Sequence, residues 1–469
     1  MSLPSASFLV PSILEALVAC DRYKDITEVV PGEADLYCAQ SLKDRAGIVL
    51  TGDSDLLIHD LGRGGAVSFF RDIEPVPKDA KGNLRSRVYH PATIADRLRL
   101  PKSDGLRALA FELYQGPNKG FGELLSEARV SKAISSQPEE YEAFRKEYVC
   151  LLAQPKLSTE INMLHVLKVL DPRVSEYVLQ FPFIAEVAGQ SLEYNTSDPT
   201  PHIFLPFLFD YPLRTNAWEM SRAIRQLAYG LINLISPEDQ RKSTVFEHNR
   251  QQGKLGGREL QLPETSHIPE ACSNIVAVLE QMGARLPPSP TSEMDLWLAV
   301  AVYQDIEWTH QNSKPALVQL ISQQLLLLED QSNSEKNLTW DILQFMAQIE
   351  GSYHSFRILK QTTNLLTSSR FVNSLPPSVL RLHEKLQLLP SLSSIQDISQ
   401  TIVTLRRIKA TAMSETAHEI LGIVLPEVSA SPQAIHRQAK KSRKRDRVEA
   451  SMPVPLKRPN NPFGLLELE

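Results

Sequence analysis

A short apolar run that ends in two acidic residues most constrains what this chain can fold into. Residues 48–50 are Ile-Val-Leu, which predicts a buried strand. Thr51 and Gly52 end the run, and Asp53 and Asp55 follow where the strand gives way to its loop. Ligand sites in open α/β sheets form beyond the carboxyl ends of the strands. Two carboxylates at that place predict a site for a hard divalent cation such as Mg²⁺.

A second acidic pair lies upstream of this strand. Glu33 and Asp35 follow another apolar run, residues 26–30, which predicts a strand of the same type. Residues 31–32, Pro-Gly, turn the chain, and a helix is expected over residues 33–45. Acidic side chains are favourable at the N-terminus of a helix. Because both pairs follow strands, we expect the four carboxylates to converge on one edge of one sheet.

The two acidic pairs and their neighbours resemble a known nuclease region. Residues 29–39, Val-Val-Pro-Gly-Glu-Ala-Asp-Leu-Tyr-Cys-Ala, and residues 49–55, Val-Leu-Thr-Gly-Asp-Ser-Asp, are similar to the internal region of the XPG and flap-endonuclease superfamily. The nuclease domain of that superfamily is PIN-like. The similarity is nearest to the asteroid-type fungal branch, and it covers residues 8–130. A weaker likeness continues through residues 202–206 and 216–219 to residue 262.

The resemblance implies a metal-dependent endonuclease. In that superfamily an acid-Ala-acid pair and an Asp-x-Asp pair help to hold two Mg²⁺ ions. Glu33, Asp35, Asp53 and Asp55 are therefore the expected catalytic and metal-binding residues. Mg²⁺ is the implied cofactor, with Mn²⁺ as the alternative, and structure-specific cleavage of DNA phosphodiesters in DNA repair is the implied activity.

Two parts of the family pattern are missing from this sequence. The family carries further Asp ligands on strands near its N-terminus, so we expect this chain to lack the N-terminal part of the domain. A last family ligand is an Asp ahead of a Gly-rich helical turn, but residues 109–122 contain no Asp, and the nearest candidates are Asp104, Glu112 and Asn118. A catalytically inactive, nuclease-like scaffold that binds nucleic acid or protein is therefore the alternative function.

A glycine turn after this region is a candidate contact for nucleic acid. Lys119, Gly120 and Gly122 stand at the expected start of a helix. Backbone N–H groups at such a turn can bind a phosphate. A plain connection between two helices is the alternative.

Composition limits the other classes of function. The net charge of −5 does not suggest a general binder of nucleic acid, so contact with phosphates needs a local basic patch. The four cysteines lie far apart, which is typical of reduced thiols. No Ser/His/Asp or Cys/His set is visible, and the histidines form no cluster along the sequence. No run of residues is apolar for long enough to cross a membrane.

The pattern along the chain predicts an α/β region followed by a mostly α-helical one. Residues 1–130 are expected to form a partial PIN-like sheet with flanking helices, in which residues 56–70 make a hairpin around a Gly-rich centre. Residues 131–425 carry helical periodicity, with a β-hairpin near residues 244–262. The remaining tail, residues 426–469, loses apolar periodicity and is expected to be disordered and basic.

Basic residues gather in the tail between residues 437 and 447. Such a cluster is typical of nuclear import or of a nucleic-acid contact, and a solvated charge run is the alternative. A nuclear protein with DNA or RNA as partner is expected on this basis. The residues assigned to nuclear import are Lys440, Lys441, Arg443, Lys444 and Arg445.

Overall fold

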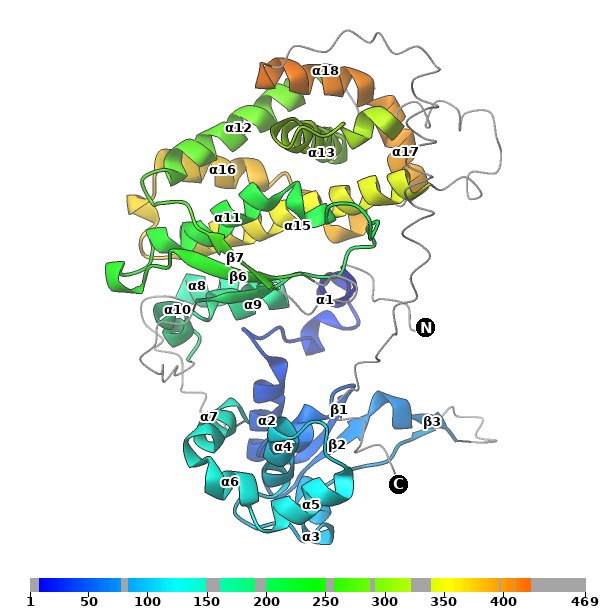
Figure 1. Ribbon diagram of the computed structural model, residues 1–469, viewed down its shortest axis with the longest axis vertical. Helices are drawn as coiled ribbons and strands as arrows, with labels where there is room; N and C mark the ends of the chain where they lie inside the picture. Colours follow the sequence, from blue (N-terminus) through cyan, green and yellow to red (C-terminus); the bar gives the residue numbers. More distant parts are fainter. Residues whose placement is uncertain are drawn as a thin grey trace. The chain divides into compact units, whose positions relative to one another are not determined.

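The computed structural model divides the chain into two compact units. The structure describes residues 8–76, 83–148, 161–189, 200–249, 257–286, 292–321, 339–395, 398–408 and 410–422. Unit 1 combines residues up to Gly32 with the described residues after residue 160, and unit 2 holds residues 33–148. Each unit is described by itself, with the element labels of Figure 1.

Unit 2 is built around a parallel pair of strands. Helix α2 (Ala34–Arg45) leads into β1 (Gly47–Thr51), which pairs in parallel with β2 (Gly65–Phe69). All five residues of β2 are buried, as expected for a parallel strand. Strands β3 (Glu74–Pro75) and β4 (Leu84–Arg85) form a short antiparallel pair. The core against the parallel pair consists of Ala39, Leu42, Leu56, Leu57, Leu61, Val67 and Phe69.

A group of helices completes unit 2. They are α3 (Pro91–Arg97), α4 (Leu106–Gln115), α5 (Phe121–Arg129), α6 (Lys132–Ser136) and α7 (Pro138–Tyr148). Figure 1 shows them gathered in cyan beside the strands. Phe111 is fully buried on α4, and its ring centroid lies 5.1 Å from that of Tyr141 and 5.3 Å from that of Phe144. Aromatic contacts of this kind stabilise the packing of α4 on α7.

Two predicted strand arrangements in this part of the chain are wrong. Residues 26–30 form no strand: Ile26 ends a 3₁₀ turn and is 80% exposed, so the apolar run has no sheet to join. Residues 56–70 form no hairpin, because Asp55–Leu57 is a 3₁₀ turn and β2 runs parallel to β1. Leu56, Leu57 and Ile58 are buried in succession, which an alternating strand does not allow.

The prediction of a strand at residues 48–50 is confirmed, but the strand is not buried. Ile48 is 58% exposed and Leu50 is 45% exposed. Val49 points to the opposite face and packs against the core of unit 2. One face of β1 is therefore covered and the other is open to solvent.

Unit 1 is mainly helical and has one large apolar core. Its three-stranded sheet consists of β5 (His202–Phe204), β6 (Thr244–His248) and β7 (Gly257–Gln261), and the β6–β7 pair is antiparallel, as the sequence predicted for residues 244–262. In Figure 1 the longer helices of unit 1 are stacked on one side of this sheet. The helices are α1 (Leu9–Ala19), α8 (Ile161–Leu167), α9 (Pro172–Val178), α10 (Pro182–Val187), α11 (Arg222–Leu231), α12 (Ile268–Ala284), α13 (Ser292–Gln311), α15 (Trp340–Ser368), α16 (Pro377–Leu386), α17 (Ile398–Arg407) and α18 (Ala410–Leu421).

A buried ion pair joins the sheet of unit 1 to α11. Arg225 on α11 is fully buried and donates two hydrogen bonds to Glu247 on β6, at 2.7 and 2.8 Å. Tyr229 donates a further bond of 2.9 Å to the same carboxylate. The pKa of Glu247 is lowered by the charge of Arg225, against the effect of burial. The guanidinium of Arg225 and the carboxylate of Glu247 therefore both remain charged inside the core.

A second ion-pair network ties α1 to distant parts of unit 1. Arg357 on α15 donates two bonds to Asp171, at 2.6 and 2.7 Å, and one of 2.7 Å to Glu15 on α1. Further along, the Gly32 N–H donates to the Ser175 hydroxyl at 2.8 Å. The first described residues are therefore held by the later helices. A helix with the length and apolar character needed to cross a bilayer is absent from the described residues.

Candidate functional site

The four predicted acids lie at the N-terminus of α2 and in the loop that follows the carboxyl end of β1, in unit 2. Glu33 is the N-cap residue of α2, and Asp35 stands in the first turn of that helix. Asp53 and Asp55 follow the carboxyl end of β1, as the sequence predicted. Glu33 and Asp53 are exposed, whereas Asp35 and Asp55 are half-buried.

Short-range hydrogen bonds shape the loop that carries the second acidic pair. The Asp53 N–H donates to the Thr51 hydroxyl at 3.0 Å, and the Asp55 N–H donates to Oδ1 of Asp53 at 3.1 Å. A carboxylate that accepts a bond from the backbone two residues on forms an Asx turn. This turn starts the 3₁₀ segment Asp55–Leu57 and fixes the spacing of the two carboxylates.

The charges of the four acids act on one another. The pKa of Asp55 is raised to about 6, first by burial and then by the charges of the other three acids. The pKa of Asp35 is also raised, by burial and then by Asp53 and Glu33. Like charges raise the pKa of a carboxyl only when they lie close to it. The structure therefore brings the two acidic pairs into one region of negative charge.

The donor set suits a hard cation in its chemistry. Carboxylate oxygens are the protein ligands that Mg²⁺ prefers, and a cation relieves the repulsion that raises the pKa of Asp35 and Asp55. Among the described residues, however, no three His, Cys, Asp or Glu side chains are grouped closely enough to hold one metal ion. The side chains would therefore have to move closer together on binding.

The glycine turn predicted to contact nucleic acid stands at the start of α5. Gly120 is the N-cap residue, and a Cβ atom added at Gly120 or Gly122 would meet nothing within 4 Å. The backbone there is open to a ligand. Lys119, by contrast, is bound: its ammonium lies 2.5 Å from the Glu127 carboxylate, which also pairs with Lys132.

Two of the candidates for the missing family ligand have structural partners. Glu112 on α4 is 2% exposed and accepts a bond of 2.6 Å from the Ala133 N–H at the start of α6. Asp104 accepts a bond of 2.6 Å from the Tyr141 hydroxyl. Both carboxylates therefore take part in packing the helices of unit 2. The nuclear-import cluster, Lys440, Lys441, Arg443, Lys444 and Arg445, lies outside the described residues.

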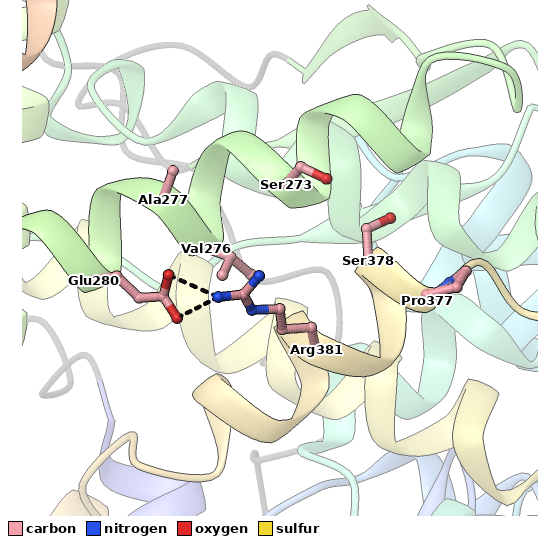
Figure 2. A pocket seen from close by; sticks show the side chains of 7 residues that line it. All are labelled: Ser273, Val276, Ala277, Glu280, Pro377, Ser378 and Arg381. Atoms are coloured by element: carbon pink, nitrogen blue, oxygen red, sulfur yellow. Dashed lines mark hydrogen bonds and ion pairs between the residues drawn. The ribbon is translucent and has the colours of Figure 1, made fainter.

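A hollow of about 290 Å³ lies in unit 1 between α12 and α16. Val276 and Ala277 are among the residues that line it, and Arg381 donates two hydrogen bonds to Glu280, at 2.8 and 2.9 Å (Figure 2). The Ser378 hydroxyl is buried without a hydrogen-bond partner beside it. The carboxylate of Glu280 also pairs with Lys385 at 3.0 Å, so the charged groups beside the hollow are already engaged with one another.

The comparisons with known proteins place the chain in a family. The model of the family described as XPG domain containing matches residues 5–262, which is more than half of the 469 residues. Neither a curated protein nor a solved structure matches the chain. The match includes both acidic pairs and the glycine turn of unit 2, together with the sheet of unit 1. The chain therefore belongs to the XPG domain containing family.

Proposed function

We propose that this chain is a Mg²⁺-dependent nuclease of the asteroid-type branch, which cleaves DNA phosphodiesters at structured sites. The observation that carries the proposal is the gathering of Glu33, Asp35, Asp53 and Asp55, in which burial and then the charges of the neighbouring acids raise the pKa of Asp35 and Asp55. A strongly perturbed pKa in a group of acids is a typical sign of a functional site. Membership of the XPG domain containing family supports the same assignment.

The four acids would each have a part in such a site. Glu33 and Asp53 present their oxygens to solvent, where a phosphate group and a cation can approach. Asp35 and Asp55 are half-buried and stand behind them, held by α2 and by the turn after β1. When bound, Mg²⁺ supplies a Lewis acid that stabilises charge on the phosphodiester and lowers the pKa of water. Mn²⁺ is the alternative ion, because it takes the same oxygen ligands.

A second function has its own supporting observation. In the described chain no three acids are grouped as ligands of one ion, whereas the backbone at Gly120 and Gly122 is open to a phosphate. Both features suit a nuclease-like scaffold that binds nucleic acid, with DNA or RNA as the partner, and does not cleave it. The two candidate functions differ in whether the acidic cluster binds a metal ion and supports cleavage.

Calorimetric titration of Mg²⁺ and of Mn²⁺ into the full chain separates the two. The Asp53→Asn/Asp55→Asn variant removes two of the four charges, and Asp96→Asn on the exposed side of α3 is the matched control. We expect binding by the wild type and by the control, and loss of binding in the double variant. The wild type and the control should also cleave branched DNA, and the double variant should not. Metal binding without cleavage, or no metal binding at all, would favour the scaffold.

Nuclear localisation is proposed on the basic residues of the tail. The expected signal consists of Lys440, Lys441, Arg443, Lys444 and Arg445. Fusion of residues 426–469 to a fluorescent protein should carry it into nuclei, and replacement of these five residues by Gln should abolish this. Equal distribution of the two fusions would reject the assignment.

A further inference from the structure

Two histidines of unit 1 lie on neighbouring strands of the sheet, with their rings within hydrogen-bonding distance. His202 lies on β5 and His248 lies on β6, 46 residues later. Nδ1 of His202 and Nε2 of His248 are 2.8 Å apart. At this distance the two rings share one hydrogen, so one nitrogen donates and the other accepts. Two imidazole nitrogens are therefore directed at a common point on the surface of the sheet.

Neighbouring side chains hold both rings in place. The parallel register sets Phe204 beside His248, and their rings stack with centroids 4.3 Å apart and planes 8° apart. Gln180 fixes the backbone of His202: its side chain donates to the carbonyl oxygen and accepts from the N–H, both at 2.7 Å. Ligands held in this way lose little freedom when they bind an ion.

A glycine on the third strand leaves the room that the pair needs. Gly257 on β7 is opposite His248 in the antiparallel register. A Cβ atom at this position would lie 2.2 Å from Cε1 of Phe246 and 2.8 Å from Nδ1 of His248. Any larger residue would therefore displace the ring of Phe246 or of His248.

We propose that His202 and His248 form a binding site for a zinc-type transition-metal ion, which takes the place of the shared hydrogen. The ring that donates this hydrogen then takes its other neutral tautomer, with the proton on the second ring nitrogen, so that both facing nitrogens offer a lone pair. Neutral imidazole is a good ligand for Zn²⁺, Cu²⁺ and Ni²⁺, and it is a poor one for Mg²⁺. Because Zn–N bonds are about 2.1 Å long, the two nitrogens need to separate by roughly half an ångström to bind one ion in tetrahedral geometry. The rings also need to turn, so that their lone pairs point at the ion and not at each other.

Water molecules would complete the coordination of the ion. Within the described residues, no third His, Cys, Asp or Glu is grouped with the pair as a metal ligand. Sites with few protein ligands and open positions remain accessible to a substrate or a partner group. A bound ion would also tie β5 to β6, and so it would stabilise the folded form of unit 1.

The test is a calorimetric titration of Zn²⁺ into the full chain, in excess Mg²⁺ so that the acidic cluster does not compete. His202→Asn and His248→Asn each remove one ligand, and His310→Asn, an exposed single histidine on α13, is the matched control. We expect the affinity for Zn²⁺ to fall by at least about tenfold in the first two variants and to stay unchanged in the control. Zn²⁺ should also raise the Tm of the wild type, and this increase should be lost with His248→Asn.

The Asp53→Asn/Asp55→Asn variant separates this site from the proposed nuclease site. It should bind Zn²⁺ as the wild type does, because its substitutions lie in the other unit. No Zn²⁺ binding by the wild type, or equal affinity in the wild type and both histidine variants, would overturn the proposal. If His248→Asn does not fold, His202→Asn decides the question, because His202 is exposed at the first strand of the sheet.

Discussion

At the scale of single residues, Asp305 gives unit 1 a predictable dependence on pH. Asp305 on α13 is fully buried, and its Oδ2 accepts a bond of 2.8 Å from the Val318 N–H, at the start of a helical turn. Its Oδ1 is buried without a hydrogen-bond partner. Burial raises the pKa of Asp305 to about 7, against the effect of the backbone bonds. The folded state therefore holds a proton that the unfolded state releases above its ordinary pKa.

The sign of the effect follows from this order of the two pKa values. The contribution of protonated Asp305 to the free energy of unfolding is fully present below the unfolded pKa of 3.8. It is lost as pH rises towards the folded pKa of about 7. Asp305→Asn cannot ionise, so its stability should not decline in this way. We expect the variant to gain about 3 kcal/mol relative to the wild type between pH 5 and pH 8. Urea unfolding of the wild type and of Asp305→Asn, at pH 5 and at pH 8, measures their difference in the free energy of unfolding. The same difference at both pH values would show that Asp305 does not lose a proton in this range.

The four acids of the candidate site show which features of single residues could be predicted from the sequence. The motif predicted which residues gather, and their effect on the pKa of Asp35 and Asp55 agrees with that gathering. The distances between side chains were not predictable, because they depend on how α2 begins and on the turn after β1. Glu33, for example, is the N-cap residue yet makes no capping bond with its side chain.

At the scale of elements, we expect the buried pair of Arg225 and Glu247 to be the main polar contact that stabilises the packing of α11 on β6. Glu247→Gln keeps the shape but leaves the guanidinium in the core without its counter-charge. Such a loss costs roughly 3–5 kcal/mol. Replacing both partners, as Arg225→Met/Glu247→Leu, should recover most of this, because no charge then remains buried. The free energy of unfolding of the three proteins, from denaturant titration, checks this.

An exposed ion pair of the same unit provides the control. Arg285 and Glu419 lie 3.3 Å apart, with side chains 60% and 63% exposed. Glu419→Gln should therefore change the free energy of unfolding by less than about 1 kcal/mol. If this variant and Glu247→Gln were equally unstable, burial would not be the reason for the cost.

Helices were more predictable than strands, for a physical reason. A helix is formed by residues close in sequence, so the 3.6-residue spacing of apolar side chains predicted helices in residues 131–425, among them α11 and α12. A strand needs a partner from elsewhere: residues 26–30 had the composition of a strand but no partner. The facing of His202 and His248 was hidden for the same reason, because only the register of β5 on β6 brings them together.

At the scale of the whole molecule, the division into two units predicts two unfolding transitions. The first described residues belong to unit 1, since Glu15 on α1 pairs with Arg357 at 2.7 Å. Unit 2 has its own cores, and Glu112 there caps α6. Glu15→Ala removes one partner of the partly buried Arg357, and Glu112→Ala leaves the buried Ala133 N–H without its acceptor. Each loss should cost about 1–3 kcal/mol, but in a different unit.

Differential scanning calorimetry of the two variants distinguishes the units. Units that unfold separately give two transitions, and a substitution in one moves only the transition of that unit. Glu15→Ala should lower the midpoint of one transition, and Glu112→Ala should lower the midpoint of the other. α1 precedes unit 2 in the sequence, and the other helices of unit 1 follow it. A shift of the unit 1 transition by Glu15→Ala would therefore also establish that segments before and after unit 2 in the sequence fold together as unit 1. A single transition lowered by either substitution would mean that the two units unfold together.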